Sequence, residues 1–286
     1  GKVFISIKPR SGDFLPNLIK ENIKRDLKKY AVAGIVPEIL DLKYLYLEIN
    51  SKIYYDTNLA PSAEYVSSII QNNTTKYAES TELNKYGARF KYSKFLKTID
   101  ESHEAVTSNI TTIQMRRDLR VVLNTFTEYQ IGFGNEFHIN SMNGYNIKSS
   151  ALRVSDISQV VYISDIPNTN RETGSLFLFA VPSSNSNTPT IVRRNIGNVN
   201  YKKGIITLNP INIQAGKIKD GQAIVELSTT PHSNDVIGLQ DLYLQLDISS
   251  SIFEMVVDSI SSGLDPSASS YIQSSSYANG LLVRPT

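Results

Sequence analysis

The chain has 286 residues, of which 41% are hydrophobic and 20% charged, a balance typical of a globular protein that can bury a core. Its formal net charge of +2 is too small to indicate a nucleic-acid-binding surface, so we expect no nucleic acid partner. It contains no cysteine, which excludes disulfides, thiolate metal sites and a cysteine nucleophile. No apolar run reaches the roughly 18 residues that a membrane-spanning helix needs, so we expect no membrane insertion.

The chain begins with an alternating strand pattern over Val3–Lys8. No secretory signal peptide precedes this strand, and a strand under way at the first residue indicates a fragment of a longer protein with sequence missing upstream. Ser11-Gly12-Asp13 predicts a turn, and Pro16 suits the first turn of a helix. We interpret the lysine-rich side of this helix as a solvated surface, with a binding patch as the alternative. Its apolar stripe is Leu15, Leu18, Ile19, Ile23, Leu27 and Tyr30.

The stretch 32–55 is the most informative part of the sequence. Gly34 and Pro37 end one element, and a long alternating run then extends from Tyr44 to Tyr55. Period-two alternation over this length predicts a strand that is packed on one face and open to water or to a partner on the other. The packed face would carry Leu45, Leu47, Ile49, Ser51, Ile53 and Tyr55. The second face would carry Tyr44, Tyr46, Glu48, Asn50, Lys52 and Tyr54.

Two helices and another extended run follow the long strand. Ser62 is a plausible cap for the first helix, whose apolar stripe is carried by Val66, Ile69, Ile70 and Tyr77. A short helix is predicted over Ser93–Thr98, and an extended run over Ser108–Val122. Together these elements predict an α+β fold in which residues 1–123 form a ferredoxin-like split βαβ sandwich.

The second part of the chain is predicted to be rich in β-structure. Residues Asn124–Ser150 are rich in glycine and asparagine, Asn143-Gly144 among them, and mark a boundary or an irregular connection. Short strand-like runs then recur between turns, with hairpins predicted at Lys202-Lys203-Gly204 and Lys219-Asp220-Gly221. We therefore predict a β-rich domain over residues 124–248. The serine-rich residues 249–286 are predicted to be a tail, or an arm that a partner orders.

A search for reactive groups finds few candidates. The three histidines, His103, His138 and His232, are far apart and show no metal-binding spacing. Asp100, Glu101 and Glu104 could hold a hard cation, but we interpret them as solvated surface residues. Gly132-Phe133-Gly134 lacks the third glycine of a dinucleotide-binding loop. A pair of carboxylates for glycoside hydrolysis stays open, because such residues meet only in space. We predict no catalytic, metal-binding or cofactor-binding residues.

Tyrosine is the most notable residue type, with 16 tyrosines and no tryptophan. Tyr44, Tyr46 and Tyr54 fall on the same face of the predicted long strand. Their rings could simply cover neighbouring side chains while the hydroxyls stay in water. They could also form a protein-binding surface, because tyrosine offers a large contact area at a low entropic cost. Base stacking is a third reading, against which the small net charge argues. We name these three tyrosines as candidate protein-interface residues.

The order and spacing of several segments resemble the baseplate wedge proteins of contractile-tailed, T-even-type bacteriophages, specifically their large wedge subunit and the related baseplate J-like family. The resemblance extends from residue 2 to about residue 247, and no single motif in it is diagnostic. The segments that carry it are Gly34-Ile35-Val36-Pro37, Ala60-Pro61-Ser62, Ile110-Thr111-Thr112-Ile113-Gln114-Met115-Arg116 and Asn198-Val199-Asn200-Tyr201-Lys202-Lys203-Gly204-Ile205-Ile206-Thr207-Leu208-Asn209-Pro210.

The resemblance implies a structural role in the virion. Proteins of this family associate with themselves, as a dimer within a larger ring, and with other baseplate wedge proteins. The ring surrounds the central tail hub and rearranges when the tail contracts. The implied location is the tail baseplate, assembled in the host bacterial cytoplasm, and no catalytic residue or cofactor is implied. The alternatives are a glycan- or receptor-binding tail module and a carbohydrate-active tail enzyme.

Overall fold

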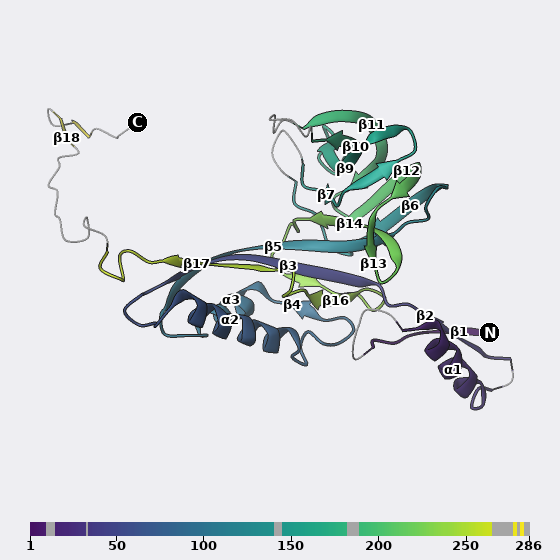
Figure 1. The fold of residues 1–286 in the computed structure, drawn as a ribbon, viewed down its shortest axis with the longest axis horizontal. Coiled ribbons are helices and arrows are strands. Elements are labelled where there is room, and N and C mark those ends of the chain that lie inside the picture. Colours follow the sequence, from purple (N-terminus) through teal and green to yellow (C-terminus); the bar gives the residue numbers. More distant parts are fainter. Residues whose placement is uncertain are drawn as a thin grey trace.

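The computed structural model describes residues 1–9, 15–32, 34–139, 145–181, 189–264, 277–278 and 281–282. The turn predicted at Ser11-Gly12-Asp13, the pair Asn143-Gly144 and residues 265–276, 279–280 and 283–286 of the predicted C-terminal arm lie outside these residues. The main body has three parts (Figure 1): a small N-terminal unit, a long sheet with helices on one face, and a barrel above one end of that sheet. Beyond it, β18 (Tyr277–Ala278) pairs with β19 (Leu281–Leu282).

The N-terminal unit comprises β1 (Lys2–Ser6), α1 (Asn17–Lys28) and β2 (Val36–Leu40). Its two strands run parallel, as a crossover through a helix allows, and form a sheet of their own. The predicted strand and helix are both present. However, no residue of α1 is buried, and Leu18 and Ile19 of its apolar stripe are exposed.

The long sheet is built around β3 and β5, which pair antiparallel along most of their length. β16 and β17 follow one another along the other edge of β3, and both run parallel to it. β14 pairs with the second half of β5, and β13 and β7 each pair with β14. The seven strands are β3 (Tyr44–Tyr55), β5 (Val106–Arg120), β7 (Lys148–Ser149), β13 (Lys217–Lys219), β14 (Gln222–Thr229), β16 (Tyr243–Leu246) and β17 (Ile252–Val257).

Helices α2 (Ala63–Ala78) and α3 (Tyr92–Asp100) pack on one face of this sheet. The predicted apolar face of β3 is buried there. Its polar member Ser51 forms a hydrogen bond of 2.8 Å with the Thr111 hydroxyl, so both of these buried hydroxyl groups have a partner. The N-terminus of α2 is capped as predicted, because the Ser62 hydroxyl accepts the Tyr65 N–H. A two-stranded sheet of β4 (Arg89–Phe90) and β15 (Val236–Ile237) lies nearby.

The barrel is a six-stranded sheet in the order β11-β10-β9-β8-β12-β6, closed because β11 also pairs with β12. The predicted hairpin joins β11 to β12, and its Gly204 has a φ of 62°, a conformation that glycine adopts easily. The barrel and the long sheet share one continuous hydrophobic core. The strands are β6 (Phe126–Gly132), β8 (Leu152–Val154), β9 (Ile157–Pro167), β10 (Thr173–Ala180), β11 (Thr190–Asn200) and β12 (Ile205–Ala215).

The fold is therefore a mixed α+β fold rich in strands, as predicted for the class. The ferredoxin-like arrangement is not confirmed: β1 and β2 form a separate parallel pair instead of joining β3 and β5 in one sheet. The domain limits at residues 123 and 248 stay a prediction. Strands β14, β16 and β17, which follow residue 123, all pair with strands that precede it. Within the described ranges, no helix has the length and apolar character needed to cross a membrane.

Candidate protein-binding surface

The second face of β3 is divided into a covered half and an open half. Tyr44 and Tyr46 lie in the covered half and are buried within the chain, whereas Tyr54 lies in the open half and is half-buried. The structure thus brings two of the three candidate tyrosines together and leaves the third apart. Whether any of them contacts a partner stays a prediction.

The covered half contains a cluster of tyrosines. The rings of Tyr44 and Tyr46 stack with centroids 5.5 Å apart, and Tyr243 meets Tyr44 edge-on at 6.0 Å. The Arg116 guanidinium lies 4.6 Å and the Lys219 ammonium 4.7 Å from the centroid of the Tyr46 ring. Aromatic pairs and cation–π contacts of this kind each contribute roughly 0.5–1.5 kcal/mol. Tyr44 and Tyr46 also line a groove of about 420 Å³ between the sheet and β6.

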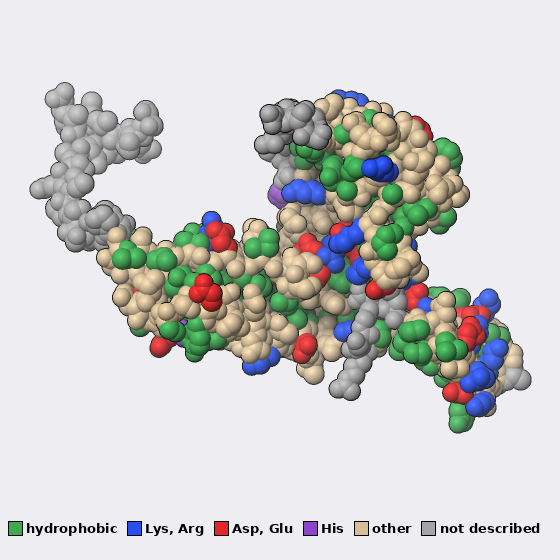
Figure 2. Space-filling model, in the orientation of Figure 1, with side chains coloured by type: hydrophobic (Ala, Val, Ile, Leu, Met, Phe, Trp, Pro, Cys, Tyr) green, Lys and Arg blue, Asp and Glu red, His purple; other side chains and the backbone are tan. Residues whose placement is uncertain are grey.

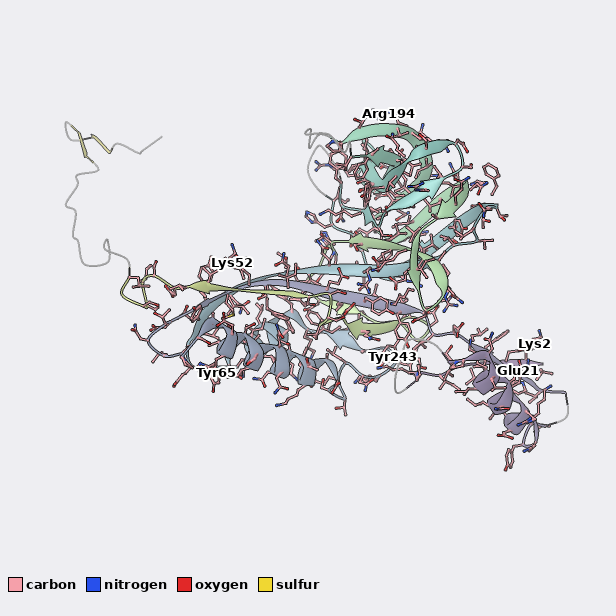
Figure 3. All side chains as sticks on the ribbon, viewed as in Figure 1. Lys2, Glu21, Lys52, Tyr65, Arg194 and Tyr243 are labelled. Carbon is pink, nitrogen blue, oxygen red and sulfur yellow. The ribbon has the colours of Figure 1, made fainter. Side chains whose placement is uncertain are left out.

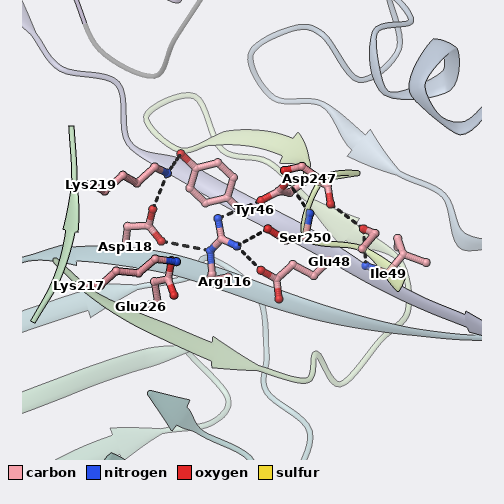
Figure 4. Close-up of polar contacts among 12 residues, drawn as sticks. Tyr46, Glu48, Ile49, Arg116, Asp118, Lys217, Lys219, Glu226, Asp247 and Ser250 are labelled. Atoms are coloured by element: carbon pink, nitrogen blue, oxygen red, sulfur yellow. Dashed lines mark hydrogen bonds and ion pairs between the residues drawn. The ribbon is translucent and has the colours of Figure 1, made fainter. Parts of the chain in front are cut away.

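Arg116 lies at the centre of an ion network on this face (Figure 4). Its guanidinium group donates hydrogen bonds to three carboxylates. One goes to Glu48, one runs from Nε to Asp118 Oδ1 at 3.2 Å, and one runs from Nη2 to Asp247 Oδ2 at 3.1 Å. Lys219 Nζ lies 2.9 Å from Asp118 Oδ2. We call these five residues the Arg116 network. It joins β3, β5 and β13 to the turn that leads into β17.

The network shifts the pKa values of its members. Burial works against the charge of Arg116, but Asp118, Glu48 and Asp247 outweigh it, so the pKa of Arg116 rises above its ordinary value. Burial raises the pKa of Glu48, despite the opposing effect of Arg116. Burial also acts to raise the pKa of Asp247, but hydrogen bonds from the two following serines and the charge of Arg116 leave it lowered. Each carboxylate faces a cation, an arrangement that holds strands together.

The open half continues across three strands. The register aligns Lys52 with Ile110 on β5 and with Glu254 on β17, and aligned residues of paired strands project to the same face. Ile110 and Ile252 are 61% and 59% exposed. Lys52 Nζ lies 3.8 Å from Glu254 Oε2. We call this surface the open face; it is formed by Asn50, Lys52, Tyr54, Ser108, Ile110, Thr112, Ile252, Glu254 and Val256.

Figures 1 and 3 show how this surface is placed. Lys52 projects from the side of the sheet opposite the helices, whereas Tyr65 projects from α2 on the other side. The barrel stands above the opposite end of the sheet, so among the described elements none covers the open face. On this part of the surface, separate hydrophobic patches lie among charged groups and other side chains (Figure 2). The arrangement suits contact with another protein.

Sequence reasoning missed the apolar members of the open face. Ile110 lies in a run predicted as extended, but its exposure depends on what covers the sheet. Ile252 joins the face because β17 returns to the edge of β3, about 200 residues later in the chain. Neither strand's own periodicity encodes this pairing.

The groups considered for metal binding do not assemble into a site. Among the described residues, no three His, Asp or Glu side chains lie together as a metal site would need. His103 Nδ1 accepts the Ala105 N–H at 3.1 Å. Asp100 accepts a hydrogen bond of 2.6 Å from the Asn109 amide. These contacts stabilise the turn after α3.

Two family models match this chain, both of the baseplate structural protein gp6: its C-terminal domain I over residues 1–40 and its C-terminal domain III over residues 43–118. The baseplate wedge protein gp6 of Enterobacteria phage T4 is 27% identical over 271 residues, which cover 84% of this chain. The chain is thus similar to baseplate wedge proteins of bacteriophages. The comparisons thus confirm the resemblance.

This family comprises structural proteins of the phage tail baseplate, a part of the virion. The chain spans 40% of the length of the curated relative that it matches. The match to domain I coincides with the N-terminal unit, and the match to domain III runs from the start of β3 into β5. The baseplate wedge family therefore matches the parts of the chain that carry both its exposed N-terminal strands and two of the three strands of the open face.

Proposed function

We propose that this chain is a baseplate wedge protein that works by assembly, and that it self-associates through the open face. The observation that supports this most directly is that Ile110 on β5 and Ile252 on β17 are both exposed on the same face of the sheet, on either side of β3. Apolar groups gathered on a flat surface mark interaction sites more often than isolated exposed side chains do. Burying them against a second protein would remove their area from water at roughly 25 cal/mol per Å².

The charges of the open face fit a two-fold contact. In such a contact the same patch is used by both copies, so it must complement itself. Lys52 and Glu254 lie on neighbouring strands near the middle of the patch. A two-fold axis through the patch brings Lys52 of one copy towards Glu254 of the other. The patch therefore carries no net charge that would oppose association.

Binding to other wedge proteins, and rearrangement of a ring around the tail hub, extend this proposal. They rest on the similarity to the wedge proteins. The groove beside β6 does not favour glycoside hydrolysis as an alternative function, because both carboxylates that line it are ion-paired. Asp41 lies 2.5 Å from Lys20 and 3.1 Å from Arg120, and Asp118 lies within the Arg116 network. Ion-paired carboxylates of this kind favour a structural role over acid–base chemistry.

Sedimentation over a range of protein concentrations tests self-association. We expect the wild type to form a dimer, and Ile110→Glu to shift it towards monomer, because the substitution places a charge within the apolar contact. The matched control is Ile218→Glu on β13, where the wild-type side chain is 66% exposed but lies away from the open face. A wild type that stays monomeric at its solubility limit contradicts the proposal, and so does equal behaviour of the two variants.

A further inference from the structure

The N-terminal unit exposes an unusual amount of apolar surface for its size. It has two strands and one helix, and no residue of the helix is buried. Parallel strands normally lie covered on both faces, and sheets that are stable alone have at least three strands. Figure 2 shows hydrophobic side chains at the surface of this unit, beside a row of basic ones. Its exposed apolar residues are Val3, Phe4, Leu18, Ile19, Tyr30, Val32, Ile35, Val36 and Leu40.

One edge of this two-stranded sheet cannot accept a further strand well. The Val36 N–H donates to Gly1 O at 2.8 Å, which fixes the direction of the main-chain groups along β2. Because successive residues of a strand alternate in direction, Pro37 and Ile39 present their main-chain groups to the outer edge. Pro37 has no N–H to donate, and proline is typical of sheet edges that stay unpaired. The outer edge of β2 is therefore blocked.

Within the part of the chain that the structure describes, no strand pairs with the outer edge of β1. By the same alternation, Lys2 and Phe4 direct their N–H and C=O groups away from β2. At the far end, the Ser6 carbonyl accepts a hydrogen bond of 2.8 Å from the Tyr86 hydroxyl, which ends the free edge. Phe4 is 63% exposed and shares its face of the sheet with Val36 and Leu40, which are also exposed. An added strand would find main-chain partners and the exposed Phe4 side chain, with the polar residues Lys2 and Ser6 on either side of it on the same face.

We propose that β1 is the acceptor edge for an extended segment of another polypeptide, which adds to the N-terminal unit as a third strand. Residues 1–40 contain eight lysines and arginines but four acidic residues. Two of the acidic residues are already paired with lysines, Asp26 with Lys29 at 2.8 Å and Glu38 with Lys24 at 2.9 Å. Because the N-terminal unit is basic, we expect the segment of the other polypeptide to carry acidic residues at its ends. Between them, apolar and other residues should alternate. Strand addition takes affinity from main-chain hydrogen bonds and specificity from the side chains.

A second copy of this chain fits the edge less well than a different protein. An antiparallel two-fold pairing of β1 with itself, centred on Phe4, sets Lys2 opposite Ser6 of the other copy. The Ser6 carbonyl is already used by Tyr86, so two of the cross-strand bonds would be lost. This site is also separate from the open face, on a different sheet. The two surfaces therefore do not overlap, and a different protein can occupy this edge while the open face binds a second copy.

The probe is a set of overlapping 15-residue peptides from the other baseplate wedge proteins of the same phage, with peptides of this chain included. We expect the chain to bind peptides that alternate apolar residues and carry acidic flanks. Phe4→Pro removes one outward N–H, and we expect it to weaken binding about tenfold or more. Tyr30→Ala is the matched control, because this exposed side chain lies on the unit but beyond the end of α1.

Hydrogen exchange gives a second readout that needs no variant. On peptide binding, the Lys2 and Phe4 amides are expected to become protected, while the outward Ile39 amide on the blocked edge stays unchanged. Protection of both edges, binding only of peptides from this chain, or no binding by any peptide would overturn the proposal. Phe4→Pro should still dimerise through the open face, so this test and the sedimentation test fail independently.

Discussion

Replacing Arg116 by methionine removes the cation of the Arg116 network while keeping most of the side-chain volume. Asp118 keeps Lys219, but Glu48 and Asp247 lose the cation that faces them. Removing one partner of a buried ion pair costs about 3–5 kcal/mol, because the remaining charge is left uncompensated. The carboxylate side chains here retain 12–20% of their exposure, so water screens part of this loss. We therefore expect Arg116→Met to lower the free energy of unfolding by about 3 kcal/mol at neutral pH.

The effect should depend on pH. The lowered pKa of Asp247 means that its contribution to stability is present above the unfolded value of about 3.9 and is lost as the pH falls through the folded pKa. Glu48, whose pKa is raised, acts with the opposite sign: its contribution is present below about 4.3 and is lost as the pH rises through the folded pKa. Without Arg116 both groups take up protons more readily. The difference between the two proteins should therefore shrink from pH 7 to pH 4.

Urea unfolding at both pH values measures this difference, and hydrogen exchange of β17 locates it, since Asp247 lies just before that strand. Arg193→Met is the matched control: Arg193 pairs with Asp156 at 2.7 Å, but both side chains are more than a third exposed. Such a surface pair contributes about 0–1 kcal/mol. If the two substitutions destabilise the protein equally, or if the Arg116→Met effect is the same at both pH values, the reasoning about this network is wrong.

Two further predictions concern the barrel. Tyr201→Phe removes the hydroxyl that donates to Asp165 at 2.6 Å in the barrel interior, where both residues are fully buried. We expect the free energy of unfolding to fall by about 1–3 kcal/mol, measured by thermal or urea unfolding. No loss would mean that water replaces the hydroxyl. Gly204→Ala places a side chain at a φ of 62°, where its Cβ would overlap the Asn135 carbonyl. We expect this substitution to destabilise the β11–β12 hairpin by about 1–3 kcal/mol, measured by hydrogen exchange of its amides.

Local patterns predicted the elements that depend on neighbours in sequence. The alternation of β3 correctly identified its buried face, down to the polar exception Ser51. The cap at Ser62 and the hairpin at Gly204 follow from short-range chemistry, and both are present. These features succeed because a period or a turn residue directly reflects the backbone conformation.

What the sequence did not reveal depends on pairing between distant segments. Tyr44 and Tyr46 alternate as a solvent face would, but Tyr243 and Lys219 come from about 170–200 residues later and cover them. The ferredoxin-like prediction assumed that neighbouring strands share a sheet. Instead, residues 41–43 separate β2 from β3, and each joins a different sheet. Period-two patterns define the faces of a strand but carry no information about which strand lies beside it.

The arrangement of the long sheet links stability to assembly. Ile252 belongs to the open face only because β17 lies against β3, and the turn before β17 is held by Arg116 through Asp247 and Ser250. One half of this face of β3 therefore carries the Arg116 network, and the other half carries the proposed contact surface. At the opposite end of the sheet, the N-terminal unit is attached through Tyr86 and through Lys8, whose ammonium lies 4.5 Å from the Tyr243 ring centroid. One sheet thus fixes the relative positions of the two surfaces for which we propose binding.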